Sequence, residues 1–166
     1  MSVRKRTVIA VLALAIGSGL ALGPTASATA SHGYLDGAGS TLTDDWGDEG
    51  TLSTTSYAHS NLAAAWQGIL YADGYLSASG IDCRFGTATK NATIKWQRAR
   101  GLVADGKVGP KTFGKADNKL YANGGNVWYD GTKRDVVLRR KNGNYYVYDG
   151  AWHLASYTKA TLPRCR

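Results

Sequence analysis

The spacing of apolar and polar positions predicts three helices in the middle of the chain. The first begins after Ser60, whose hydroxyl suits an N-cap, and ends before Gly74. Its apolar side chains recur at positions i, i+4, i+7 and i+8, on one helical face, and are Leu62, Trp66, Ile69 and Leu70. A second helix is expected over about 87–100, with Thr87 as a candidate N-cap, and a third over about 110–120.

The hydrophobic period changes to alternation after about residue 123. Three apolar runs are separated by tight-turn sequences, and they cover residues 136–138, 145–148 and 152–157. The Asn142-Gly143 pair between the first two runs is a strong signal for a two-residue hairpin. We therefore expect an antiparallel β-meander over 123–166, with a further strand near 127–129, packed on the helices because so small a sheet needs a partner surface. The expected fold class is α+β, a small three-helix bundle over 59–122 followed by the meander.

One short pattern occurs twice within the predicted helical region. Residues 82–89 and 105–112 both read Asp-x-basic-apolar-Gly-x-x-Thr. A Trp-Gln pair precedes each copy on a predicted helix, at Trp66-Gln67 and at Trp96-Gln97. In each copy Asp suits the opening of a turn, and the glycine permits a backbone conformation that a side chain would resist. A repeat this short indicates one compact domain with internal pseudo-symmetry rather than a solenoid.

These motifs, in this order, resemble the small three-helix type of bacterial peptidoglycan-binding domain. Further positions that match the family pattern are Ala63, Leu70, Gly74-Tyr75, Ala92 and Gly101-Leu102. The resemblance covers about residues 60–120, and it implies a three-helix fold and a function in cell-wall binding. Two positions depart from the family pattern, because Cys83 stands where Gly is usual and Thr93 stands where Val is usual.

A module that binds a cell-wall glycan needs flat aromatic faces and hydrogen-bonding groups. Tyr71 and Tyr75 near the end of the first helix supply such groups, as do Arg84 and Thr89 around the first turn. We take these four as candidate ligand-binding residues; the alternative is that each packs within the fold. Further aromatic residues lie in the meander, where alternation lets at most half of them face one way, and they are Tyr145, Tyr146, Tyr148 and Trp152.

Residues 1–30 have the features of a secretory signal peptide. A basic start at residues 4–6 precedes a short apolar stretch, and A-x-A cleavage sequences end at Ala28 and Ala30. The alternative is an uncleaved membrane anchor, which would require a longer apolar stretch. We therefore expect a secreted, extracellular protein associated with the cell wall, in which residues 31–58 form a flexible arm rich in Gly, Ser, Thr and Asp.

Cys83 and Cys165 are the two cysteines of the sequence. An even number of cysteines in a secreted chain indicates a disulfide, which would join the first turn to the end of the meander. Two free thiols are the alternative. The cysteines and the three scattered histidines show no metal-ligand spacing, so we expect no metal site and no cofactor.

Charge divides the chain into an acidic part and a basic part. Residues 31–82 contain seven acidic residues and no Lys or Arg, whereas residues 83–166 contain 17 basic and five acidic residues, a net charge of +12. A basic half attracts anionic partners, although ordinary solubility is the alternative explanation. We expect peptidoglycan as the partner, with anionic wall polymers as a second candidate. We expect no nucleic acid, no membrane contact after signal removal, and a monomer.

The sequence contains no catalytic residues that we can assign. It has no Cys-His pair in a recognisable hydrolase context and no G-x-S-x-G nucleophile turn. Asp44, Asp45, Asp48 and Glu49 could supply a glycosidase carboxylate pair, but we interpret them as solvating the arm. We expect a non-catalytic wall-binding protein. The alternatives are a small wall hydrolase with an unrecognised site in the C-terminal part, and a secreted inhibitor or interaction protein.

Overall fold

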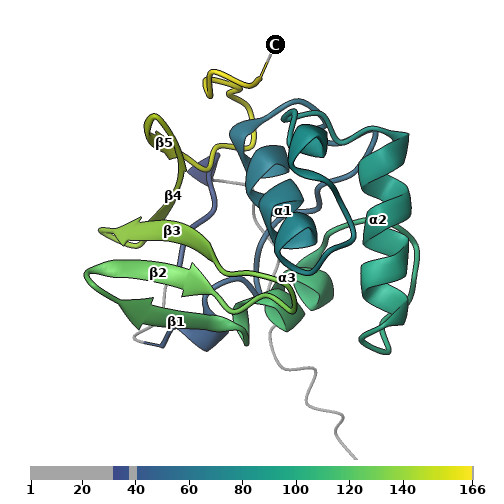
Figure 1. The fold of residues 1–166 in the computed structure, drawn as a ribbon, viewed down its shortest axis with the longest axis horizontal. Helices are drawn as coiled ribbons and strands as arrows, with labels where there is room; N and C mark the ends of the chain where they lie inside the picture. The colour runs from purple at the N-terminus through teal and green to yellow at the C-terminus, as the bar shows by residue number, and fades with distance from the viewer. Residues whose placement is uncertain (1–31, 38–40, 166) are drawn as a thin grey trace, which may run out of the picture.

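The protein is described by a computed structural model, which covers residues 32–37 and 41–165. The α-helices are α1 (Asn61–Ala72), α2 (Thr87–Arg98) and α3 (Pro110–Asp117). The strands are β1 (Leu120–Asn123), β2 (Asn126–Tyr129), β3 (Val136–Lys141), β4 (Asn144–Asp149) and β5 (Ala151–Leu154). Two short 3-10 turns are η2 (Leu42–Asp44) and η3 (Ala78–Gly80). Figure 1 shows the strands gathered on one side of the molecule and the helices on the other, so the predicted α+β class is confirmed.

The helices begin where capping chemistry places them. The Ser60 hydroxyl accepts the backbone N–H of Ala63 at 3.0 Å, as predicted for the first helix. The prediction of Thr87 as an N-cap is wrong, because Gly86 is the extended N-cap residue and Thr87 is already helical. The third helix follows the same rule, with a glycine as its N-cap and Pro110 in its first turn, where a missing N–H is tolerated.

The sheet is an antiparallel meander in the order β1-β2-β3-β4-β5. The β3–β4 hairpin turns at Asn142 and Gly143, whose positive φ angles of 52° and 82° are those that such a turn requires. Strand β1 was not predicted, because its residues extended the helical pattern of 110–120 up to a glycine pair. The third predicted run is shorter than expected, since the chain leaves the sheet at Leu154 and Ser156 then pairs with Tyr34.

The arm that was expected to be flexible packs into the core where the structure describes it. Its side chains of Leu35, Trp46 and Leu52 are at most 1% exposed. The Trp46 ring meets the Phe113 ring edge to face, with 6.2 Å between the ring centroids. The free energy gained by burying these apolar side chains favours an ordered arm, despite the glycine-rich composition from which flexibility was inferred.

Two arm carboxylates are buried anchors rather than solvating groups. Asp45 accepts a hydrogen bond from the Tyr145 hydroxyl, and Glu49 accepts one from the Tyr157 hydroxyl at 2.6 Å. Asp45 and Glu49 are each 1% exposed. Burial raises the pKa of Glu49 to about 8, although the bonds from Tyr157 and from the Asp36 N–H act in the opposite direction. The arm therefore joins the sheet through buried polar contacts as well as through apolar packing.

Asp73, the residue that ends α1, connects the helices to the sheet. Its carboxylate accepts the indole N–H of Trp96 at 2.7 Å, the Tyr129 hydroxyl at 2.6 Å and the Arg100 guanidinium at 2.6 Å. Thr132 adds its backbone N–H and its hydroxyl, each at 2.8 Å. Burial alone would raise the pKa of Asp73, but the hydrogen bonds from Tyr129, Thr132 and Trp96 outweigh it and hold the pKa below its usual value.

The predicted signal peptide, with its cleavage sites at Ala28 and Ala30, lies outside the described residues. Within residues 32–37 and 41–165, no helix has the length and apolar character that a bilayer span requires.

Candidate functional site

The first copy of the repeated turn is held by the side chain of Gln67. Its amide NH₂ donates to the Asp82 carboxylate at 2.7 Å, to the Arg84 carbonyl at 3.0 Å and to the Thr89 hydroxyl at 2.9 Å. Its carbonyl oxygen accepts the backbone N–H groups of Asp82 and Cys83 at 3.0 and 2.9 Å. We call this set of bonds the first turn network.

The second copy repeats the arrangement around Gln97. The Gln97 amide donates to the Asp105 carboxylate at 3.1 Å, to the Lys107 carbonyl at 2.7 Å and to the Thr112 hydroxyl at 3.1 Å. Its carbonyl oxygen accepts the Gly106 N–H at 2.9 Å. We call this set of bonds the second turn network. The sequence repeats Gln, Asp and Thr because, in each copy, the side-chain amide of Gln forms hydrogen bonds to Asp and Thr of one turn.

The two turns differ at one position, which is Cys83 in the first copy and Gly106 in the second. Both residues have a left-handed backbone, with φ angles of 64° and 72°. A side chain is disfavoured in that conformation, so Cys83 needs a compensating interaction. The structure supplies one, because Cys83 forms a disulfide with Cys165 across 82 residues of sequence. The C-terminal segment is thereby attached to the first turn.

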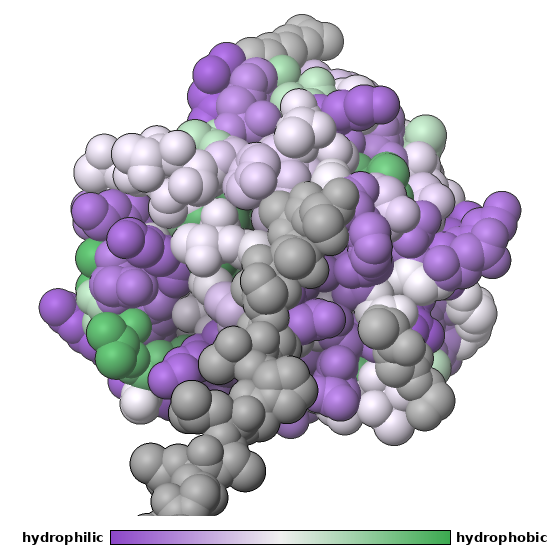
Figure 2. Space-filling model, turned by 180° about the vertical axis from the view of Figure 1, so that it is seen from behind, coloured by the Kyte–Doolittle hydropathy of each residue, from purple (hydrophilic) through white to green (hydrophobic). Residues whose placement is uncertain are grey.

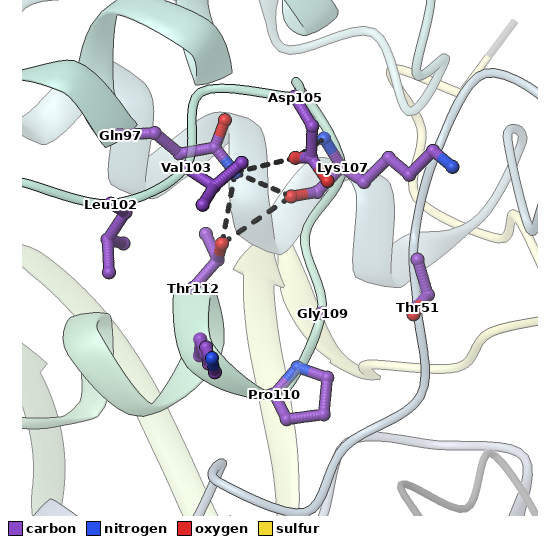
Figure 3. A pocket seen from close by; sticks show the side chains of 10 residues that line it. Thr51, Gln97, Leu102, Val103, Asp105, Lys107, Gly109, Pro110 and Thr112 are labelled. Carbon is purple, nitrogen blue, oxygen red and sulfur yellow. Dashed lines mark hydrogen bonds between the residues drawn. The ribbon is translucent and has the colours of Figure 1, made fainter.

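A cavity of about 360 Å³ opens beside the second turn network, and we call it the second-turn cavity. Figure 3 shows Gln97 with dashed bonds to Asp105, Lys107 and Thr112, and Thr51 of the arm on the opposite side from Gln97. Its lining residues are Thr51, Gln97, Leu102, Val103, Asp105, Lys107, Gly109, Pro110, Lys111 and Thr112. The arm, the α2–α3 connection and the start of α3 therefore build the cavity together.

The second-turn cavity has an apolar wall and a charged rim. The amide of Gln97 is occupied within the protein, so the floor is rigid rather than open to new hydrogen bonds. Val103 on the wall is 82% exposed. Figure 2, which shows the molecule from behind, has an apolar patch on the side where α2 lies. Lys107 and Lys111 are exposed on the rim, opposite in charge to the exposed Asp105. This arrangement suits a ligand that presents methyl groups and a carboxylate.

The structure does not bring the four predicted ligand-binding residues together. Thr89 is buried inside the first turn network, and Arg84 is exposed beside it. Tyr71 carries the guanidinium of Arg134 over its ring, 4.0 Å from the ring centroid, and lines a different hollow between α1 and the sheet. Tyr75 lines a third hollow near the end of α2.

The sequence analysis did not select the residues that line the second-turn cavity. The repeat itself held the signal, because Lys107 and Thr112 occupy the same places in the second copy as Arg84 and Thr89 in the first. Aromatic residues near the first copy favoured that copy as the predicted site. The repeat does not predict which segments pack beside each turn, because those segments are distant in the sequence.

The comparison with protein families decides what the helical region is. The family model described as "Putative peptidoglycan binding domain" matches residues 60–115. Residues 60–115 belong to this family. The peptidoglycan-binding domain thus contains α1, α2, the beginning of α3 and both turn networks, whereas the sheet lies beyond the match.

A curated relative extends the similarity past this domain. The chain is 38% identical over 130 residues to a zinc D-Ala-D-Ala carboxypeptidase from Streptomyces albus G, and the alignment covers 71% of the chain. The chain spans 45% of that protein's length. No solved structure matches the chain.

The residues that the structure describes do not fit a zinc site of the kind that the relative's name implies. His32 and Asp36 form a pair, with Nδ1 and Oδ2 2.6 Å apart, but no third metal ligand joins them in the part of the chain that the structure describes. Cys83 and Cys165 are bonded to each other and are not available as ligands. We therefore derive no chemical step through a metal.

Proposed function

We propose that the protein is a secreted, non-catalytic protein that binds peptidoglycan and uses its second-turn cavity to do so. The observation that carries the proposal is the membership of residues 60–115 in the peptidoglycan-binding domain family. The two intact turn networks support it, because they hold the domain's loops in one conformation before any ligand arrives. Secretion rests on the signal-peptide features of residues 1–30.

The chemistry of the second-turn cavity supports a peptide-bearing ligand. Peptidoglycan stem peptides combine small methyl side chains with free carboxylates. The wall formed by Leu102, Val103 and Pro110 suits the methyl groups, and Lys107 and Lys111 suit a carboxylate. The cavity has room for a fragment of a stem peptide rather than for a long glycan segment.

Sedimentation with purified insoluble peptidoglycan tests the proposal. The wild-type protein is expected in the pellet, and Val103→Asp is expected to bind at least about tenfold more weakly, equivalent to about 1.4 kcal/mol. Lys111→Glu should weaken binding by a smaller factor that shrinks as salt is added. Lys95→Glu is the matched control, because it makes the same charge change on an exposed position of α2 that does not line the cavity.

The outcomes separate the function from the site. A wild-type protein that stays in the supernatant overturns the proposal of peptidoglycan binding. Wild-type binding that Val103→Asp and Lys111→Glu leave unchanged, with thermal unfolding also unchanged, overturns the assignment of the second-turn cavity and leaves the function in place.

An enzymatic role is the second candidate function, because the relative is named as a carboxypeptidase. The assay is release of D-alanine from a peptide ending in D-Ala-D-Ala, with and without added zinc, beside a turbidity assay on whole peptidoglycan. We expect neither D-alanine nor soluble muropeptides. Steady release of either product, lost on substitution of His32 or Asp36, would replace the non-catalytic proposal.

A further inference from the structure

The outward face of the sheet carries an ordered row of aromatic side chains that the fold does not bury. Alternation directs Leu138 and Val147 into the core, so the residues directly before and after each of them on its own strand face outward. Tyr121 lies directly opposite Trp128 on neighbouring strands, and Tyr148 lies directly opposite Trp152. Val137 of β3 lies opposite Trp128 and separates the two pairs, so the row has rings on four of the five strands. Because strands are about 4.8 Å apart, the row extends about 19 Å across the sheet.

These rings are held in fixed orientations and stay at least partly exposed. The Trp128 indole donates to the Asn123 carbonyl at 3.2 Å, and the Tyr121 hydroxyl donates to Asp135 at 2.7 Å. Arg139 lies over one face of the Trp152 ring, 4.2 Å from the centroid. Tyr148 is nevertheless 54% exposed. Exposed aromatic rings that are oriented in advance are a costly arrangement for a surface with no partner.

We infer that this outward sheet face, which we call the aromatic face, binds the glycan backbone of peptidoglycan. The flat rings suit the apolar faces of pyranose rings. Arg139 and the amide of Asn126, which it contacts at 3.2 Å, offer hydrogen bonds to sugar hydroxyl and acetamido groups. The row is several sugar rings long, so the ligand is a linear glycan rather than a single sugar.

Charge favours a glycan over a nucleic acid as the occupant. The outward charged side chains of β3 are Arg139 and Lys141, and Asp135 just before the strand offsets one of them. Nucleic-acid affinity depends mainly on neutralising many phosphates. A face with a net charge near +1 is poorly suited to that task but well suited to an uncharged amino-sugar backbone.

The aromatic face would cooperate with the second-turn cavity, and in this respect the inference rests on the proposed function. Asp73 bonds to Trp96 of α2 and to Tyr129 of β2, which ties the peptidoglycan-binding domain to the sheet. A polymer held by its stem peptide at one site is presented at high local concentration to the other. Binding to the glycan alone does not require the cavity.

A titration of the isotope-labelled full chain with chitohexaose, followed by NMR, tests the inference. Chitohexaose is a linear β-1,4-linked hexamer of N-acetylglucosamine without stem peptides. The indole signals of Trp128 and Trp152 are expected to shift, while those of the buried Trp66 and Trp96 stay in place. Binding with unchanged Trp128 and Trp152 signals, or no binding at millimolar sugar, overturns the inference.

Substitutions provide the second readout. Trp152→Ala should weaken chitohexaose binding about tenfold or more, equivalent to about 1.4 kcal/mol, and Trp152→Phe should weaken it less because a ring remains. Tyr148→Ala removes the most exposed ring of the row without opening the core, and it keeps the test decisive if Trp152→Ala does not fold. Tyr57→Ala is the matched control, since that ring is 39% exposed and lies outside the sheet.

The outcomes remain distinguishable from those of the proposed function. Chitohexaose binding by a protein that fails to sediment with peptidoglycan would support the aromatic face as a glycan-binding surface and overturn the proposed function of peptidoglycan binding. Sedimentation without chitohexaose binding would support peptidoglycan binding and overturn glycan binding by the aromatic face. An oligothymidylate that shifts the Trp128 and Trp152 signals more strongly than chitohexaose, at the same ionic strength, would identify a nucleic-acid surface and overturn the inference.

Discussion

Replacing the disulfide by two different pairs of residues should separate the stabilisation by the cross-link from the backbone strain at Cys83. The bond joins Cys83 to Cys165 across 82 residues. On the chain-entropy model, a loop of that length contributes about 4.5 kcal/mol to the free energy of unfolding. Cys83→Ser with Cys165→Ser should therefore lose about 3–5 kcal/mol relative to the oxidised wild type.

The second pair uses Cys83→Gly with Cys165→Ser, and it should be the more stable of the two. Cys83 has a φ of 64°, and the equivalent Gly106 has a φ of 72°. Serine keeps the strain of a side chain in the left-handed region, whereas glycine removes it. The pair with glycine is therefore expected to unfold with a free energy about 1 kcal/mol higher than the pair with serine.

Urea denaturation followed by circular dichroism measures these differences. Gly106→Ala is a control for the reasoning, because a Cβ there would lie 2.7 Å from the Cγ of Lys90 in addition to the strained φ, so it should destabilise. Equal stability of the serine and glycine pairs would refute the backbone argument. A midpoint that does not change when the wild type is reduced would refute the stabilising role of the bond itself.

Three further predictions concern buried carboxylates and salt. The pKa of Glu49 is raised to about 8 from an ordinary value of 4.5. Its contribution to the free energy of unfolding is therefore fully present below pH 4.5 and is lost as the pH rises through 8, and the loss amounts to at most about 5 kcal/mol. Thermal unfolding across that range should show the loss in the wild type and not in Glu49→Gln; parallel profiles would contradict it. Asp73→Asn should lower the free energy of unfolding by about 3 kcal/mol, because the Arg100 guanidinium loses its buried anionic partner; a change below about 1 kcal/mol in urea denaturation would show that the network is dispensable. Binding to walls that retain anionic polymers should weaken as salt rises, since residues 83–166 carry a net charge of +12; an affinity that is constant with salt, measured by sedimentation, would contradict that attraction.

Local chemistry in the sequence was sufficient to predict the helices and most of the meander. Ser60 caps a helix through its own hydroxyl, and Asn142-Gly143 forms a hairpin because both residues accept positive φ. The family could be recognised for the same reason, since the spacing of Gln, Asp and Thr is set by bonds within a single turn network. These features depend on residues close together in the chain, so they can be predicted from the sequence pattern.

Long-range packing decided the rest. Composition predicted a flexible arm, but Trp46 and Leu52 find apolar partners that are distant in sequence, and Asp45 finds the Tyr145 hydroxyl 100 residues away. The two equivalent repeat copies meet different neighbours, because the first turn is bonded to Cys165 and the second turn shares its cavity with Thr51 of the arm. The aromatic face likewise required the register of five strands, since only the tertiary structure determines which alternate side chains meet the core and which meet solvent.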